Sequence, residues 1–262
     1  MRDRKEWDNQ AKSYERAQLR SDSLDTLIEY PAQSSAIGDV KGKTILDIGC
    51  GSGRKACDWI KAGAQEVYAF DITTEYERPW GDDIGKPLNL HVFQSDLQDF
   101  HRHQLLLGKT FDIVTSLQTP GYGASPTKVF ERILTFLKPG GLFVYTTAHP
   151  MRYAVERSEA ETMSLAEAYH DKAPYTYPGN WNKNVTSAAY PMTISDRVNA
   201  LLEAGFIIEG IEEPFMNRDL ALAYPHKYDW MKKYFGMILF KARAPNKHIH
   251  RTSNASHLPP VM

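Results

Sequence analysis

The sequence is poor in cysteine, has no long apolar run and carries no excess of charge of one sign. Lysine and arginine total 31 against 32 aspartate and glutamate, a formal net charge of −1. Nucleic-acid binding relies on neutralising phosphates, so this balance gives no sign of a nucleic-acid partner, although a local patch can hide in a neutral total. No apolar stretch reaches the roughly 18 residues of a membrane span, and the polar start predicts no signal peptide.

The two cysteines, Cys50 and Cys57, lie close together in the chain. A disulfide between them would distort the turn in which we place Cys50, so we expect reduced thiols and a cytoplasmic protein. No second pair of ligands has zinc-finger spacing, and we predict no metal site. Hydrophobic residues make up 42% of the chain, which is enough for a substantial core.

Short apolar runs alternate with helical patterns through the first half of the sequence. We predict strands over 45–48, 67–70, 90–96, 111–117 and 141–149, and helices over 54–63 and 129–137. Gly63 ends the first helix, and the run Lys138-Pro139-Gly140-Gly141 ends the second. This alternation indicates an α/β fold with a Rossmann-like, mostly parallel sheet and helices on both faces.

The rest of the chain departs from this rhythm. The first thirty residues are predicted to be helical until Pro31 interrupts them. Residues 151–192 mix a polar helical piece with aromatic and turn-forming residues, which predicts an insertion over the sheet edge. A helix over 193–206, capped by Thr193 or Ser195, precedes two last strands at 207–214 and 234–244. Because no long helix joins these strands, we predict an antiparallel close, and the apolar-poor tail 245–262 is predicted to be disordered.

A glycine-rich loop carries the strongest chemical signal. Asp47-Ile48-Gly49-Cys50-Gly51-Ser52-Gly53 follows an apolar strand and precedes a helix. Alternate glycines let the backbone turn tightly and approach a ligand closely. Dinucleotide loops use the spacing G-x-G-x-x-G for a pyrophosphate. Here the spacing is G-x-G-x-G after a carboxylate, which would repel a pyrophosphate and accept a ligand that carries an ammonium and a sulfonium.

Two further carboxylates end predicted strands. In parallel sheets, ligands bind beyond the carboxyl ends of the strands. Asp71 ends the second strand, where an acid accepts hydrogen bonds from ribose hydroxyls. Asp96 follows the third strand and could accept from an adenine amino group, with Leu97 stacked on the ring, or could simply cap the next turn.

Together these segments resemble the class I S-adenosylmethionine-dependent methyltransferases. The resemblance covers about residues 7–243 and is carried by ILDIGCGSG (45–53), VYAFDI (67–72), SDL (95–97), FDIVTSL (111–117) and LKPGGLFVYTTAHP (137–150). Trp7, Asp8, Tyr14 and TISDRVNALLEAGF look like the small-molecule branch, the type found in natural-product pathways. Two departures are SLQTPGYG after the fourth strand and the lack of an Asn-Pro-Pro-Tyr motif, which argues against nucleic-acid bases as the acceptor.

The resemblance implies the domain layout and the cofactor contacts. It implies an N-terminal helical lid (1–40), a cofactor-binding core (41–150), a cap insertion (151–192), the C-terminal part of the core (193–244) and the tail. The cofactor is S-adenosylmethionine, with S-adenosylhomocysteine as its product. The predicted cofactor contacts are Asp47, Gly49, Cys50, Gly51, Gly53, Asp71, Ile72, Asp96, Leu97 and Gln118.

The acceptor side follows from the chemistry of a sulfonium-bound methyl group. Transfer is an in-line displacement, for which the protein mainly supplies alignment. A base is needed only when the acceptor must lose a proton, and His149 at the end of the fifth strand is the predicted base, with Tyr14 beside it as a second catalytic residue. The predicted acceptor pocket is aromatic and comprises Tyr153, Tyr177, Trp181 and Tyr190, although these residues could instead form the core of the cap.

These observations predict methyl transfer to a small aromatic or heterocyclic metabolite, such as an indole or a phenol, on carbon, nitrogen or oxygen. We expect a small-molecule acceptor, no nucleic-acid or membrane partner, and a monomer or homodimer. Two alternatives stay open: a protein or RNA methyltransferase on the same fold, and a catalytically idle cofactor-binding protein. A nucleotide-linked oxidoreductase is disfavoured by the loop spacing.

Overall fold

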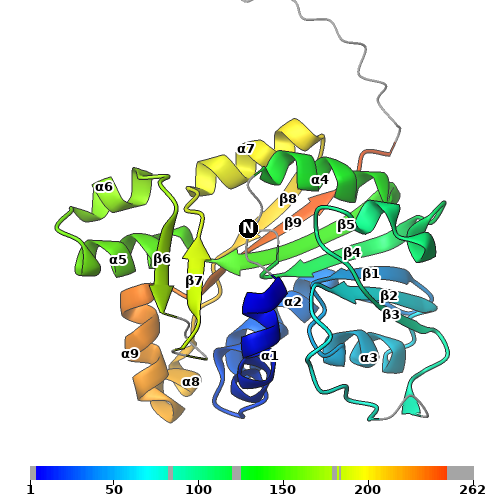
Figure 1. Ribbon diagram of the computed structural model, residues 1–262, viewed down its shortest axis with the longest axis horizontal. Helices are drawn as coiled ribbons and strands as arrows, with labels where there is room; N and C mark the ends of the chain where they lie inside the picture. The colour runs from blue at the N-terminus through cyan, green and yellow to red at the C-terminus, as the bar shows by residue number, and fades with distance from the viewer. Residues whose placement is uncertain (1–3, 82–84, 120–124, 179–181, 183, 247–262) are drawn as a thin grey trace, which may run out of the picture.

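The computed structural model describes residues 4–81, 85–119, 125–178, 182 and 184–246 of the chain. Its centre is one seven-stranded sheet in the order β3-β2-β1-β4-β5-β9-β8 (Figure 1). The strands are β1 (Thr44–Ile48), β2 (Glu66–Asp71), β3 (Leu90–Gln94), β4 (Phe111–Leu117), β5 (Leu137–Ala148), β8 (Ile207–Glu212) and β9 (Met237–Arg243). Strand β9 is antiparallel to both of its neighbours, β5 and β8, whereas β1 to β5 pair in parallel. The predicted α/β class and antiparallel close are therefore confirmed.

Helices cover both faces of this sheet. They are α1 (Arg4–Gln18), the π-helical turn η1 (Asp25–Glu29), α2 (Tyr30–Ile37), α3 (Arg54–Lys61), α4 (Pro126–Thr135), α5 (Pro150–Ala160), α6 (Leu165–His170), α7 (Ile194–Ala204), α8 (Arg218–Ala223) and α9 (Pro225–Tyr234), with short 3₁₀ turns at Phe100–Arg102 and Gln104–Leu106. Figure 1 shows α4 and α7 on one face and α2 and α3 on the other. Within the described ranges, none of the helices is long and apolar enough to cross a membrane.

The core has two halves, one on each face of the sheet. On the α4 and α7 face, buried aromatic and aliphatic side chains such as Phe143, Tyr145 and Phe240 pack against Phe130 and Leu201. On the opposite face, a second cluster packs α2 and α3 against the sheet. Strand residues alternate between the two clusters because successive side chains point to opposite faces. Both faces are therefore buried, as the apolar strands predict.

The remaining elements gather beyond one end of the sheet. Helices α5, α6, α8 and α9 lie there together with the antiparallel pair β6 (Tyr175–Pro178) and β7 (Thr186–Ala189) (Figure 1). Buried Met216 and Met231 join this region to Ile28 of η1. Most of the predicted insertion 151–192 thus consists of two helices and a strand pair.

Two local predictions are wrong. Pro31 does not interrupt the N-terminal helices, because it lies in the first turn of α2, where the missing N–H is not needed. The run 138–141 does not end a helix. Helix α4 ends at Thr135, and β5 begins at Leu137 opposite Phe111. The last two strands are joined by two short helices, α8 with 6 residues and α9 with 10, which the sequence pattern did not predict.

The cap of α7 allows a matched test of local stability. The Thr193 side chain accepts the Asp196 N–H at 3.1 Å, and the Asp196 carboxylate accepts the Thr193 N–H at 3.0 Å. We expect Thr193→Ala to lower the free energy of unfolding by about 1 kcal/mol, because this N-cap is lost. Chemical denaturation would measure it. Ser195→Ala, at an exposed position in the same turn, is the control and should change stability by a few tenths of a kcal/mol at most. Equal losses in both variants would contradict the assignment of the cap.

Candidate functional site

The glycine-rich loop joins β1 to α3 in a left-handed backbone conformation. Gly49, Gly51 and Gly53 have φ values of 75°, 57° and 85°, which disfavour any side chain. The Gly49 and Cys50 N–H groups both donate to the Phe70 carbonyl, at 2.8 and 2.9 Å. A Cβ atom on Gly49 would lie 1.8 Å from Thr119 Oγ1. The close approach of Thr119 to this loop is therefore possible only because Gly49 has no side chain.

Asp71 closes the loop from the end of β2. One carboxylate oxygen accepts the Gly51 N–H at 2.9 Å, and the other accepts the Thr73 N–H at 3.2 Å. Burial raises the pKa of Asp71, and these backbone hydrogen bonds oppose the rise. A carboxylate has about four acceptor positions, so Asp71 can still accept hydrogen bonds from a ligand.

Asp47 is the most buried acid of the site. Its side chain is 2% exposed and accepts the Thr115 hydroxyl at 2.9 Å. Burial raises the pKa of Asp47 to about 7, against the opposing effects of Thr115 and the charge of Lys55. Asp47 thus lies at the base of the cleft as a carboxyl group that a bound cation would keep ionised.

Because of this shift, Asp47 should make the protein less stable as the pH rises. The unfolded carboxyl loses its proton near pH 4, whereas the folded one holds it to about pH 7, so stability falls across that window and is then constant. We expect Asp47→Asn to equal the wild type near pH 4 and to exceed it above pH 7 by on the order of 1–4 kcal/mol. Denaturation at pH 5, 6, 7 and 8 would measure the difference.

Asp112→Asn is the matched control with the opposite sign. Burial alone would raise the pKa of Asp112, but hydrogen bonds from Thr44 and Lys138 outweigh this effect and lower the pKa. The Asp112 carboxylate stabilises the fold at pH values above its pKa in the unfolded state, and this stabilisation is lost as the pH falls through its pKa in the folded state. Asp112→Asn should therefore be less stable than the wild type at pH 8. An Asp47→Asn protein that is also less stable at pH 8 would contradict the assignment.

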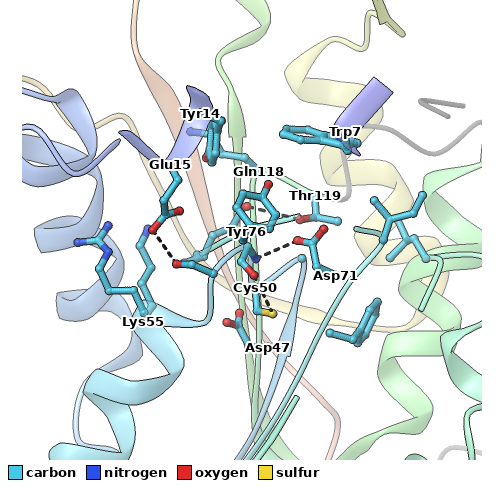
Figure 2. Close-up of a pocket in the computed structure, with 18 of the residues that line it drawn as sticks. Trp7, Tyr14, Glu15, Asp47, Cys50, Lys55, Asp71, Tyr76, Gln118 and Thr119 are labelled. Atoms are coloured by element: carbon cyan, nitrogen blue, oxygen red, sulfur yellow. Dashed lines mark hydrogen bonds between the residues drawn. The ribbon is translucent and has the colours of Figure 1, made fainter. Parts of the chain in front are cut away.

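The N-terminal helix α1 closes one side of the cleft. Its Tyr14 and Trp7 meet edge to face with centroids 5.7 Å apart, and both line the cleft (Figure 2). Glu15 accepts the Ser52 hydroxyl at 2.7 Å, which ties the helix to the glycine-rich loop. Helix α1 thus contacts the glycine-rich loop, and its role as a lid stays a prediction.

Two basic residues at the start of α3 face the π-helical turn. Asp25 accepts a hydrogen bond from Arg54 at 2.9 Å and one from Lys55 at 2.8 Å. Lys55 also donates to Gln33 of α2 at 2.9 Å. Asp25 is almost completely buried. Arg54 and Lys55 therefore hold η1 and α2 against the start of α3, next to the glycine-rich loop. All these residues line the cleft.

Most predicted cofactor residues meet in this one cleft, which is partly open to solvent. Those that line it are Asp47, Gly49, Cys50, Gly51, Asp71, Ile72, Asp96, Leu97 and Gln118, and Tyr14, predicted to be catalytic, lines it as well. Gly53 precedes α3 and is not among the lining residues. Asp96 accepts the Gln98 N–H at 2.7 Å, so it stabilises a turn as well as facing the cleft.

His149 lies away from the lining residues. It is 2% exposed, its ring stacks on Phe235 at 4.9 Å, and its Nδ1 accepts the Met151 N–H at 3.1 Å. Its Nε2 lies 2.7 Å from a Glu213 oxygen. Since both ring nitrogens are engaged, these contacts favour a structural role, and catalysis by His149 stays a prediction that they do not support.

The predicted acceptor residues are placed apart from the cofactor cleft. Tyr153 and Tyr177 both pack near Tyr175, with centroids 6.3 and 6.0 Å from it. Tyr190 is partly exposed after β7, and Trp181 lies outside the described residues. None of the three described residues lines the cofactor cleft.

Sequence reasoning missed several lining residues. Tyr76 lies under the loop, with ring atoms 3.7 Å from where a Cβ on Gly51 would be, and Arg78 donates to the Gly51 carbonyl at 2.8 Å. Arg54 and Lys55 directly follow the loop, a position that could have flagged them. In the described part of the chain, no three His, Cys, Asp or Glu side chains gather as a metal site.

A parallel sheet with a glycine-rich β1–α3 loop and an acid at the end of β2 defines a Rossmann-like nucleoside-binding fold. The family model described as "Methyltransferase domain" matches residues 16–185. The chain therefore belongs to this methyltransferase family, and it is a S-adenosylmethionine-dependent methyltransferase.

Similar proteins agree with this assignment. The chain is 27% identical over 199 residues to a ubiquinone biosynthesis O-methyltransferase of Psychrobacter cryohalolentis, covering 71% of this chain and 74% of the relative. It is also 27% identical over 144 residues to a tRNA U34 carboxymethyltransferase of Idiomarina loihiensis, covering 51% of this chain and 40% of the relative.

Solved structures share the fold. A S-adenosylmethionine-dependent methyltransferase of Mesorhizobium loti has a TM-score of 0.64 at 24% identity, covering 82% of this chain and 97% of that one. Others with this fold were solved with S-adenosylmethionine or S-adenosylhomocysteine bound. The cofactor is S-adenosylmethionine, and the glycine-rich loop beside Asp71 fits a ligand with a ribose and a cationic sulfur.

Proposed function

We propose that this methyltransferase modifies a small aromatic or heterocyclic metabolite. The observation that carries the proposal is an aromatic cluster beyond the ends of β4 and β5. Arg152 of α5 lies over the Trp230 ring, 5.2 Å from its centroid. Tyr153 and Tyr177 lie close enough to Arg152 to influence its pKa. Flat aromatic faces with one partly exposed cation suit an aromatic acceptor.

The proposal assigns the cofactor to the cleft. The loop Gly49–Gly53 would contact its methionine part, Asp71 would accept hydrogen bonds from its ribose, and Asp96 with Leu97 would contact its adenine. Bound S-adenosylmethionine supplies a methyl group already activated on a sulfonium. The protein then holds the acceptor in line and excludes water, with α1, Tyr14 and Gln118 closing the cleft between the two ligands.

The test is a screen with methyl-labelled cofactor against fractionated metabolites, simple phenols and hydroxyindoles, with bulk tRNA and protein as separate arms. We expect label in a small aromatic or heterocyclic compound, whose mass rises by one methylene. Asp71→Ala is the negative control. Label found only in tRNA or protein would overturn the proposal in favour of a macromolecular acceptor. Cofactor binding with no labelled acceptor in any arm would favour an idle cofactor-binding protein.

A further inference from the structure

Glu29 stands at the border between the cofactor cleft and the aromatic cluster. It is the last residue of η1, a π-helical turn, and such turns often occur at functional sites. Its Oε2 accepts a hydrogen bond from Gln118 Nε2 at 3.0 Å. Gln118 directly follows β4 and lines the cofactor cleft. Glu29 therefore contacts Gln118, a residue of the cleft wall, from outside the cleft.

The backbone of Gln118 is held in an unusual conformation. Its φ of 66° lies in the left-handed region, which a non-glycine residue seldom adopts. Its N–H donates to the Thr146 carbonyl at 2.7 Å, and its side chain is fixed by Glu29. Strained residues of this kind cluster at active sites, where the surrounding structure holds them. The pair Glu29–Gln118 is thus fixed where the two ligands would meet.

Arg152 connects Glu29 to the aromatic cluster through its charge. The charge of Arg152 acts on the Glu29 carboxyl, which places the two side chains near one another. Arg152 itself is bonded to Glu156 at 2.9 Å and lies over Trp230. Glu29 remains partly exposed. A hydroxyl group on an acceptor bound against these aromatic rings would have Glu29 as a neighbouring carboxylate.

The surroundings of Glu29 suit proton exchange near neutral pH. Burial raises the pKa of Glu29 to about 7, as does the charge of Asp25, while Lys55, Arg152 and the hydrogen bond from Gln118 oppose the rise. A general base works best when its pKa lies near the working pH. His149, in contrast, has both ring nitrogens engaged.

We propose that Glu29 is the general base of the reaction and that the acceptor is therefore a hydroxyl compound, a phenol or hydroxyindole. This inference rests on the proposed function. The acceptor oxygen forms a bond to the methyl carbon while the carbon–sulfur bond breaks and its electron pair stays on sulfur. The hydroxyl proton passes to the Glu29 carboxylate and then to water. Gln118 keeps the carboxylate aimed at the acceptor.

Glu29→Gln tests this role with little change in shape, because a glutamine carbonyl can still accept the hydrogen bond from Gln118. The probes are catechol, 3,4-dihydroxybenzoate and 5-hydroxyindole, with labelled cofactor from pH 5.5 to 9. We expect the wild-type kcat/KM to rise with pH to a plateau, with a midpoint near 7. In Glu29→Gln, kcat/KM should fall by about 10²–10⁴-fold and lose this rise.

The controls separate catalysis from structure. Glu29→Gln should bind S-adenosylhomocysteine within about threefold of the wild type by calorimetry, and at pH 8 it should melt no lower than the wild type, because a neutral side chain replaces a half-buried carboxylate. Glu159→Gln on α5, an exposed glutamate that pairs with Lys233, should keep wild-type turnover. Glu29→Gln with full turnover, or with the pH dependence intact, would overturn the inference while leaving the proposed function standing. Methylation confined to carbon or to a tertiary nitrogen would also overturn it, and no labelled small molecule at all would overturn both.

Discussion

Replacing Asp71 with alanine is expected to weaken the binding of both S-adenosylmethionine and S-adenosylhomocysteine by roughly 30- to 1000-fold. A hydrogen bond to a charged group contributes about 1.5–3 kcal/mol, and a ribose offers two hydroxyl donors to one carboxylate. The same side chain accepts the Gly51 and Thr73 N–H groups, so its loss also loosens the glycine-rich loop. Calorimetric titration with each ligand would measure the change.

Two further variants show which part of the loss belongs to the ligand. Asp71→Asn keeps an acceptor for the loop but removes the charge, so it should bind with intermediate affinity. Asp112→Ala removes a carboxylate that also accepts a backbone N–H, from Thr44, but lies outside the cleft. It should lower stability and leave affinity within a few-fold. Undiminished affinity in Asp71→Ala would refute the assignment of the cofactor to this cleft.

The cofactor half of the site could be predicted from the sequence because its parts are local. The glycine-rich loop and the acids that follow β2 and β3 are each set by a few neighbouring residues. The rule that ligands bind at the carboxyl ends of parallel strands then brings them together. Gln118 follows from the same rule, and it too lines the cleft.

The proposed acceptor half could not be predicted in the same way, because its contacts are tertiary. Glu29 meets Gln118 across 89 positions of sequence, and no local pattern marks that pair. Strand β5 ends at Ala148, one residue before the predicted end at His149, and the His149 ring contacts Phe235 and Glu213, which are both distant in sequence. The sequence pattern did not predict α8 and α9, because such short helices are stabilised mainly by packing, here around Met231.

Adding a single methyl group at Gly49 should strongly weaken cofactor binding. In Gly49→Ala, the new Cβ would lie 1.8 Å from Thr119 Oγ1 and within 2.9 Å of the Thr119 methyl group, so Thr119 or the loop must move. Thr119 lines the cleft beside Gln118, and its movement would fill space that the ligand needs. We expect affinity to fall by at least about 100-fold, which corresponds to about 2.7 kcal/mol.

Gly42→Ala is the matched control for backbone strain. Gly42 has a φ of 70°, close to the 75° of Gly49, but a Cβ atom there would meet nothing within 4 Å. Both variants carry the penalty of a left-handed alanine, about 1–2 kcal/mol of stability, which melting curves would report. Only Gly49→Ala should also lose affinity for S-adenosylhomocysteine. If the two variants bound S-adenosylhomocysteine equally well, backbone strain alone would explain why position 49 is a glycine. That result would mean that the loop does not contact the cofactor.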